Sequence, residues 1–173
     1  MGKTWLTSDL HFFHKNIIVY CGRPYEDEYR MNDGILTAWN KVVEPEDRVI
    51  IVGDLTAGLK QRETELAFLI EELKGEKTLI RGNHDHQTDQ WYLDAGFKHV
   101  ADWLFDDGIL YVHKPATSYN PEVIQLKEQL DPRLIIHGHI HDARPQIDEH
   151  FNVAWDRHNR LILLDETNTH VIS

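Results

Sequence analysis

The sequence contains little cysteine, no long apolar run and few basic residues. Cys21 is the only cysteine among 173 residues, so the chain can form neither an internal disulfide nor an all-thiolate zinc site. No apolar run approaches the roughly 18 residues that a membrane span requires, and the opening "MGKTWLTSDL" lacks a secretory apolar segment. We therefore expect a cytoplasmic protein without a membrane role, in which any metal is bound by imidazole, carboxylate and amide groups.

The charge balance is strongly acidic. Eighteen Lys and Arg residues face 29 Asp and Glu residues, which gives a formal net charge of −11, and no stretch concentrates the basic ones. An extended nucleic-acid-binding surface is therefore not expected, because it would need a basic track along the chain. The length and the 41% hydrophobic content fit one domain over residues 1–173, and the sequence carries no signal for the oligomeric state.

The apolar pattern predicts an α/β protein. Eight short apolar runs bounded by polar or turn residues are predicted strands: "KTWLTS", "RVIIVG", "KTLIRG", "HVADWLF", "ILYVHK", "RLIIHG", "FNVAWD" and "RLILLD". Helical spacing is found in "MNDGILTAWNKVV", "KQRETELAFLIEELKG" and "NPEVIQLKEQL", and more weakly in "TDQWYLDAG". Strands and helices alternate early, whereas "DDG" at 106–108 indicates a β-hairpin later. This mixture favours two sheets over one parallel sheet.

Polar clusters follow the first two of these strands. Asp9 and His11 come after the first strand, and residues two apart on an extended chain point the same way, so both could reach one ion. Asp54 follows Gly53 after the apolar "RVIIV". Each feature alone is better explained as a cap, a turn or a surface residue.

Three more clusters follow later strands. Asn83, His84 and Asp85 come after Gly82, where a strand ends in a turn. His113 ends "ILYV", although a lone histidine on an apolar strand usually packs in the core. The strongest single signal is the pair of imidazoles in "HGHIH", a spacing that recurs among metal ligands.

Taken together, the clusters supply seven candidate ligands at the ends of predicted strands: Asp9, His11, Asp54, Asn83, His113, His139 and His141. Seven oxygen and nitrogen ligands are too many for one tetrahedral zinc, but they suit two divalent ions that share a carboxylate. Two such ions can hold a bridging hydroxide for in-line attack on a phosphoryl group. The pattern therefore indicates a binuclear hydrolase.

The ordered motifs D-x-H, G-D, G-N-H-D, H and G-H-x-H resemble those of the calcineurin-like metallophosphoesterase family, and the stretch "SDLHFFHKNIIVYCGRPY" resembles a small bacterial and phage branch of it. The resemblance implies an α/β fold, a four-layer α/β/β/α sandwich with two mixed β-sheets. One departure is Ala57, where many members carry a second aspartate after the G-D motif.

The resemblance also implies roles for the individual residues. The first ion would be held by Asp9, His11, Asp54 and His141, and the second by Asp54, Asn83, His113 and His139. His84 would bind no metal; it would stabilise the transition state or protonate the leaving oxygen, with Asp85 orienting its ring.

Substrate contacts are less sharply indicated. His14, Lys15, Asn16 and Arg23 follow the first motif closely, and by the resemblance they could line the substrate entrance. Arg23 could bind a phosphate with paired hydrogen bonds, but a surface arginine before Pro24 is the slightly more ordinary explanation. Lys114 adjoins His113 and is either an anion contact or a solvated strand end.

The leading hypothesis is a metal-dependent phosphodiesterase that acts on a small phosphoester, with nucleotide-like diesters among the candidates. Mn²⁺ is our first choice of metal, and Fe²⁺, Ni²⁺, Co²⁺ and Zn²⁺ suit the same ligands. The alternatives are a phosphomonoesterase of nucleotides or phosphoproteins and a non-catalytic metal-binding interaction scaffold. A mononuclear zinc hydrolase would leave Asn83 and several other ligands unexplained.

Overall fold

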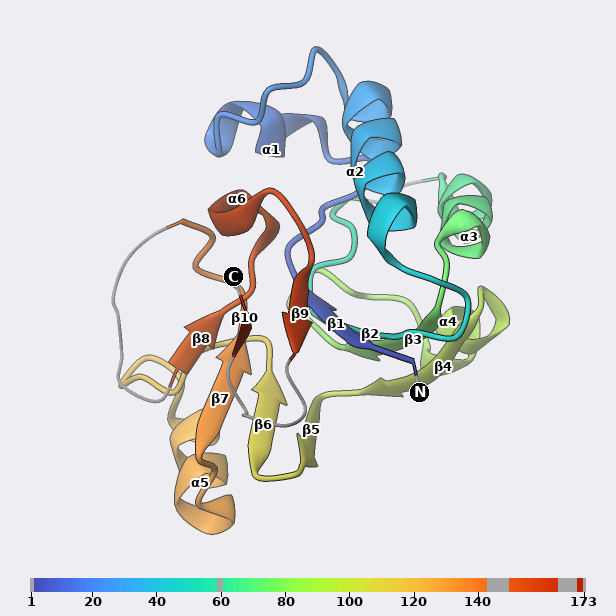
Figure 1. Ribbon diagram of the computed structural model, residues 1–173. Helices are drawn as coiled ribbons and strands as arrows, with labels where there is room; N and C mark the ends of the chain where they lie inside the picture. Colours follow the sequence, from blue (N-terminus) through green and yellow to red (C-terminus); the bar gives the residue numbers. More distant parts are fainter. Residues whose placement is uncertain (1, 59–60, 143–149, 165–170, 173) are drawn as a thin grey trace.

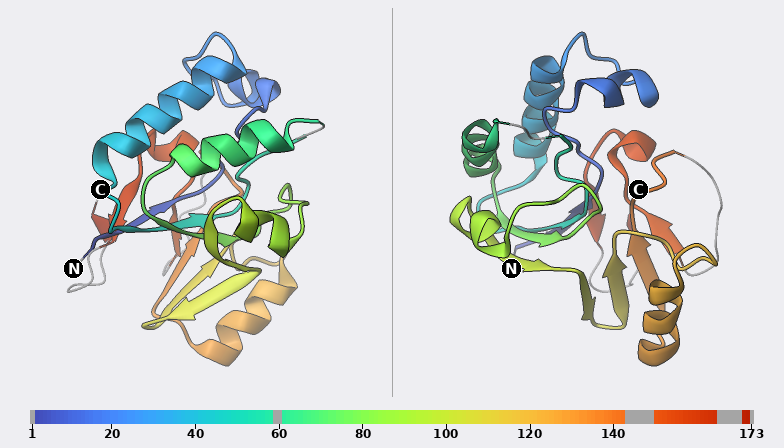
Figure 2. Two further views of the ribbon diagram at one scale, coloured as in Figure 1. Left: turned by 90° about the vertical axis from the view of Figure 1, so that its right-hand side faces the viewer. Right: turned by 180° about the vertical axis from the view of Figure 1, so that it is seen from behind.

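The computed structural model describes residues 2–58, 61–142, 150–164 and 171–172. Two β-sheets pack face to face, and helices cover the outer face of each sheet (Figure 1). Seen from the side, the order is helices, larger sheet, smaller sheet and helix (Figure 2). The predicted four-layer α/β/β/α arrangement is therefore confirmed.

The larger sheet has six strands in the order β10-β9-β1-β2-β3-β4. Their bounds are β1 Thr4–Thr7, β2 Arg48–Val52, β3 Glu76–Ile80, β4 Phe97–Ala101, β9 Ile162–Leu164 and β10 Val171–Ile172. The four strands β1 to β4 are parallel, whereas β9 runs antiparallel to β1 and to β10. β1 is wholly buried, and so are β2 and β3 after their first residues, because both faces of the sheet are covered there.

The smaller sheet has the order β5-β6-β7-β8, with bounds β5 Trp103–Asp106, β6 Ile109–Val112, β7 Leu134–His137 and β8 His150–Asn152. The predicted hairpin at "DDG" is confirmed, because β5 and β6 pair antiparallel around Asp107 and Gly108. The strands β6, β7 and β8 are parallel. Both sheets are thus mixed.

The helices are α1 Lys15–Tyr20, α2 Glu28–Val42, α3 Glu63–Glu72, α4 Asp89–Asp94, α5 Pro121–Leu130 and α6 Trp155–His158. α2 begins where the Asp27 carboxylate accepts a hydrogen bond from the backbone N–H of Arg30 at 2.8 Å. α4 begins in the same way at Thr88. Among the described residues, no helix is long and apolar enough to cross a membrane.

Strand alternation divides the apolar side chains into three cores. On one face of β2, Ile51 belongs to the same core as Ile35 and Trp39 of α2. On the other face, Ile50 belongs to a second core with Ile136 of β7. The far side of the smaller sheet packs against α5 in a third cluster of four buried residues, Leu110, Val112, Val123 and Ile135. The cores hold the two sheets and their helices as successive layers.

Three details differ from the sequence-based prediction. The run "HVADWLF" divides between β4 and β5, which belong to different sheets, so Asp102 marks a crossing that the apolar pattern does not reveal. "FNVAWD" ends as α6 rather than as a strand, and α1 was not predicted. Residues 60 and 165, at the ends of a predicted helix and a predicted strand, lie outside the described residues.

Candidate metal centre

The carboxyl ends of five strands meet at one edge of the double sheet. β1, β2 and β3 lead into the loops that carry Asp9, Asp54 and Asn83, while β6 and β7 lead to His113 and His139. The loops after β1 and β2 are joined by backbone hydrogen bonds, from the N–H of Asp9 to the Gly53 carbonyl at 2.9 Å and from the N–H of His11 to the Asp54 carbonyl at 3.1 Å. This topology brings all seven candidate ligands to one place.

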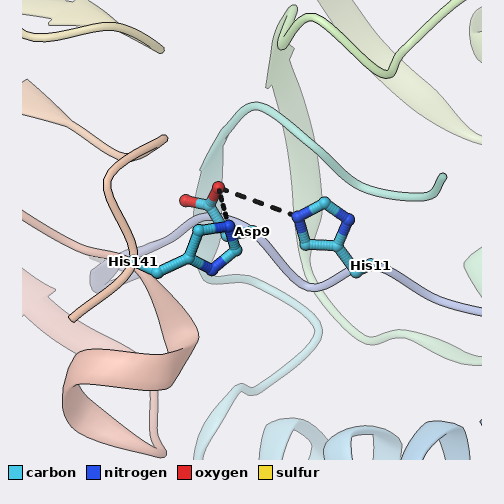
Figure 3. A group of neighbouring side chains, drawn as sticks. All are labelled: Asp9, His11 and His141. Atoms are coloured by element: carbon cyan, nitrogen blue, oxygen red, sulfur yellow. Dashed lines mark ion pairs between the residues drawn. The ribbon is translucent and has the colours of Figure 1, made fainter. Parts of the chain in front are cut away.

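The first cluster is formed by Asp9, His11 and His141 (Figure 3). Asp9 Oδ1 lies 3.9 Å from His11 Nε2 and 3.7 Å from His141 Nε2. The other oxygen, Asp9 Oδ2, accepts hydrogen bonds from Ser8 Oγ at 2.5 Å and from the N–H of His139 at 3.0 Å. Oδ1 also accepts the N–H of His139, at 3.2 Å, but no side chain donates to it, and it faces the two imidazole nitrogens beyond hydrogen-bond range.

The second cluster is formed by Asp54, His113 and His139, with Asn83 beside it. His113 Nδ1 hydrogen-bonds the Val52 carbonyl at 2.9 Å, so this nitrogen carries the proton. His113 Nε2 then faces Asp54 Oδ2 at 3.3 Å, Asn83 Oδ1 at 3.2 Å and His139 Nδ1 at 3.2 Å. Three acceptor atoms thus converge on one nitrogen, an arrangement that a proton on Nε2 or a metal ion bound there would satisfy.

Asp54 lies between the two clusters. Its Oδ2 is 3.7 Å from His11 Nε2 and 3.3 Å from His113 Nε2, while Oδ1 accepts the backbone N–H of His84 at 3.0 Å. Burial alone would raise the pKa of Asp54, but the hydrogen bond and charge of His113 outweigh it and hold the pKa at about 2. Asp54 is therefore an ionised carboxylate that can be shared by both clusters.

The buried polar atoms fit a divalent cation. Both ring nitrogens of His11 are buried without a hydrogen-bond partner, and burial lowers the pKa of His11 to about 3, so the ring is neutral with a free lone pair. Burial also raises the pKa of Asp9, which means that this carboxylate lacks a sufficient counter-charge. Carboxylate, amide and imidazole donors in two adjoining groups suit two divalent ions.

The motif glycines make room for ligands of neighbouring strands. A Cβ on Gly53 would overlap the His113 ring, one on Gly82 would overlap Asp54, and one on Gly138 would overlap Ser8 and Asp9. The glycines of G-D, G-N-H-D and G-H-x-H are therefore required by close approach. Each glycine lets its loop pack directly against a ligand, or the residue next to a ligand, from another loop.

The backbone at the ligands is strained. Asp9, His11, Asp54, His139 and His141 all have positive φ, between 48° and 70°. The reasoning that residues two apart on an extended strand point the same way therefore does not hold here, because the strands end before the ligands. The pairs converge through left-handed loop conformations, whose strain is typical of functional sites.

His84 and Asp85 are placed differently from each other. His84 is exposed, and its ring centroid lies 5.6 Å from that of His11, at the edge of the first cluster. The Asp85 carboxylate is buried and accepts the backbone N–H groups of Gly82, Asp54 and Leu55 at 2.8, 2.8 and 3.0 Å. Asp85 thus fixes the loops that carry the ligands, and among the described residues its carboxylate makes no hydrogen bond or ion pair with the His84 ring, so the predicted orienting role is corrected.

Arg23 also departs from its expected place. It is 5% exposed, and its guanidinium binds Asp156 at 2.6 and 2.9 Å and the Asp9 carbonyl at 2.7 Å. These partners occupy the donors that a phosphate would need. Arg23 is therefore a structural residue behind the first cluster, and the predicted substrate contact is corrected.

Asp156 is a site residue that the sequence reasoning missed. Its Oδ2 lies 2.6 Å from His141 Nδ1, so the carboxylate orients the ring whose Nε2 faces Asp9. Asp156 ends the run "FNVAWD", just as Asp54 follows "RVIIV", and that similarity was the available signal.

The remaining substrate-binding candidates surround the site. The His14 ring is 5.4 Å from that of His11, Asn16 is exposed on α1, and Lys114 is half-buried beside His113.

Comparisons with known proteins identify the family of the chain. A family model described as calcineurin-like phosphoesterase matches residues 2–143. The uncharacterized protein MJ1445 of Methanocaldococcus jannaschii is 35% identical over 143 residues, which cover 82% of this chain and 70% of that protein. The Gene 66 protein of Mycobacterium phage L5 is 29% identical over 196 residues, covering 96% and 92%.

A solved structure shares the fold over almost the whole chain. The protein of unknown function AQ665 from Aquifex aeolicus superposes with a TM-score of 0.74 at 27% identity, covering 94% of this chain and 96% of that one. The family that the ordered motifs resemble is thereby confirmed. With its ligand motifs in order at the meeting strand ends and the family model matching most of its length, the chain belongs to the calcineurin-like phosphoesterases.

Proposed function

We propose that the protein is a binuclear metal-dependent phosphoesterase that prefers phosphodiesters. The observation that carries the proposal is Asp54, whose single oxygen Oδ2 faces His11 of one cluster and His113 of the other. A shared, ionised carboxylate between two donor groups is the arrangement that a pair of adjacent divalent ions requires. Mn²⁺ is the first metal to test, with Fe²⁺, Ni²⁺, Co²⁺ and Zn²⁺ as alternatives.

The donor sets divide into two sites. Asp9, His11 and His141 would hold one ion, and His113, His139 and Asn83 the other, with Asp54 common to both. When bound, the ions supply Lewis acidity, which activates water as a nucleophile and neutralises the phosphoryl oxygens. The protein would fix the geometry: Asp156 orients His141, and the Val52 carbonyl orients His113.

His84 would act as the general acid. Its imidazole is exposed at the edge of the first cluster, while its backbone N–H is anchored on Asp54, so the side chain is free to meet substrate. In the hydrolysis, the water oxygen bonds to phosphorus and gives its proton to solvent. The P–O bond to the leaving group breaks, and the leaving oxygen takes the His84 proton.

The first experiment compares bis-p-nitrophenyl phosphate with p-nitrophenyl phosphate as substrates. Metal-stripped protein is assayed with Mn²⁺, Ni²⁺, Zn²⁺ or Mg²⁺ restored one at a time, and bound metal is quantified in each sample. Metal-dependent cleavage that is faster on the diester supports the proposal. Faster monoester cleavage points to a phosphatase instead, and no cleavage of either compound by a fully loaded protein points to an interaction scaffold.

A further inference from the structure

A pocket of about 520 Å³ opens beside the second cluster. Its wall includes the candidate ligands Asn83 and His113, so the pocket is continuous with the proposed metal centre. The remaining wall comes from the loop after β3, from Asp102 and the start of β5, from the end of β6 and from the first turns of α5. Its volume lies within the range of about 300–1,000 Å³ that is usual for small-molecule sites. A substrate whose phosphoryl group sits at the clusters could therefore place a second group in this pocket.

The pocket has an apolar floor and one exposed aromatic wall. Val112 and Val123 are buried on its floor beside Leu126. Trp103 lines the side and remains 43% exposed, although tryptophan is the largest apolar side chain. An indole left open next to a reaction centre offers a face on which a planar ring can stack.

The polar groups of the pocket are of two kinds. Arg81 is fully engaged, because its guanidinium binds Asp89 and the carbonyls of Asp85 and Gln87. Lys114, in contrast, makes no hydrogen bond or ion pair within the described part of the chain, and Glu122 is exposed at the rim. Asp102, also exposed, lines the pocket as well, so the pocket offers one free donor and two free carboxylate acceptors around an apolar floor.

We propose that this pocket binds the nucleobase of a nucleotide-type phosphodiester, with Trp103 as the stacking residue. The inference rests on the proposed function and adds the substrate class. A nucleobase has a planar ring for Trp103, a ring acceptor or carbonyl for Lys114 and N–H donors for Glu122. An alkyl chain would fill the floor but would offer no hydrogen-bond partner to Lys114 or Glu122.

The test uses three diesters with the same leaving group: the p-nitrophenyl esters of thymidine 5′-monophosphate, of phenyl phosphate and of methyl phosphate. Trp103→Leu is compared with Phe105→Leu, which removes another exposed aromatic side chain of β5 that does not line the pocket. We expect Trp103→Leu to lower kcat/KM about tenfold on the thymidine ester and less than about twofold on the methyl ester. Phe105→Leu should leave both values unchanged.

A binding measurement separates this inference from the proposed function. Quenching of tryptophan fluorescence by thymidine 5′-monophosphate should be lost in Trp103→Leu and kept in Phe105→Leu, whether or not any ester is cleaved. If the thymidine and phenyl esters respond equally to Trp103→Leu, the pocket reads only an aromatic ring and the nucleobase assignment is overturned. If all three esters respond equally, or if Trp103→Leu binds the nucleotide as wild type does, the pocket is not a base subsite. Absence of cleavage with retained Trp103-dependent binding would overturn the proposed function alone.

Discussion

Two histidines that face the clusters are each held in place by a second residue. His141 turns Nε2 toward Asp9 because Nδ1 is held by Asp156, whose carboxylate is in turn bound by Arg23. His113 is fixed in the same manner by the carbonyl of Val52. No residue in the described part of the chain holds the exposed His84 ring in this way, in keeping with a residue that must meet a substrate.

His84→Ala should separate catalysis from metal binding. The side chain belongs to neither donor group, so the metal content should stay at the wild-type value, while loss of the general acid should reduce kcat by about 10²–10⁴-fold. Metal analysis and steady-state kinetics on the same preparation check both points. His99→Ala, which removes an exposed histidine of β4, serves as the control, and a wild-type kcat in His84→Ala would refute the assignment.

Asp156→Asn should weaken one metal site selectively. The amide cannot keep the charge-assisted contact with His141 Nδ1, so affinity at the first cluster should fall about 10–100-fold while the second cluster keeps its ion. Calorimetric titration of stripped protein with Mn²⁺ resolves the two events. The control is Asp107→Asn, which removes an exposed carboxylate that also pairs with an arginine and should change the affinity of neither metal site. If Asp156→Asn weakened both sites equally, Asp156 would act only on the fold.

At the scale of elements, the loops after the strands are joined to one another before any metal is considered. Asp85 connects the loop after β3 to the loop after β2 through backbone N–H groups, and Gly82 lets Asp54 approach. The opposite ends of the strands are joined as well. Near the start of β1 and β2, the Asp47 carboxylate accepts hydrogen bonds from Lys3 N–H at 2.7 Å, Trp5 Nε1 at 2.9 Å and Glu44 N–H at 3.0 Å.

Asp47→Asn should destabilise the fold in a pH-dependent way. Burial alone would raise the pKa of Asp47, but its three hydrogen bonds hold it below the ordinary value of 3.8. A lowered native pKa means that the stabilisation is present above about pH 4 and is lost as the pH falls through the native pKa. We expect Asp47→Asn to lower the free energy of unfolding, measured with urea, by about 1–3 kcal/mol at pH 7. The difference from wild type should become smaller below pH 4. A pH-independent loss would mean that packing, not the carboxylate charge, is responsible.

The candidate metal ligands could be predicted from the sequence, whereas the residues that hold them in place could not. The seven candidate ligands were found because each directly follows an apolar run, and four of them come one or three residues after a motif glycine. Asp156 and Arg23 were not found in their actual roles, because they meet across 133 positions of the chain and no local pattern encodes that contact. The same holds for "HVADWLF", in which no local pattern reveals the change of sheet at Asp102.

At the scale of the whole molecule, the acidic balance and the site are connected. The protein carries a net charge of −11, and it buries the carboxylates of Asp9 and Asp54 at 0% and 2% exposure. Two divalent ions would supply four positive charges at that point. A site of this kind can attract a phosphate even though the molecule as a whole is acidic.

Metal binding should therefore stabilise the folded chain. With free metal at about 100 times Kd, the expected gain is about 2.7 kcal/mol per site, which corresponds to a Tm increase of about 5–10 °C. Thermal unfolding of stripped protein across a Mn²⁺ titration measures it, and Asp54→Ala should flatten the response. A wild-type Tm that does not depend on metal concentration would contradict this account of the buried carboxylates.

Each cluster draws its ligands from both sheets. Asp9 and His11 of the larger sheet meet His141 from the smaller one, and Asp54 meets His113 and His139 in the same way. A slight sliding of one layer over the other would change the distances within both clusters at once. The affinity for metal therefore depends on how the two sheets pack against each other. A substitution buried between the sheets, such as Ile136→Val, should lower the metal affinity before it measurably lowers the free energy of unfolding.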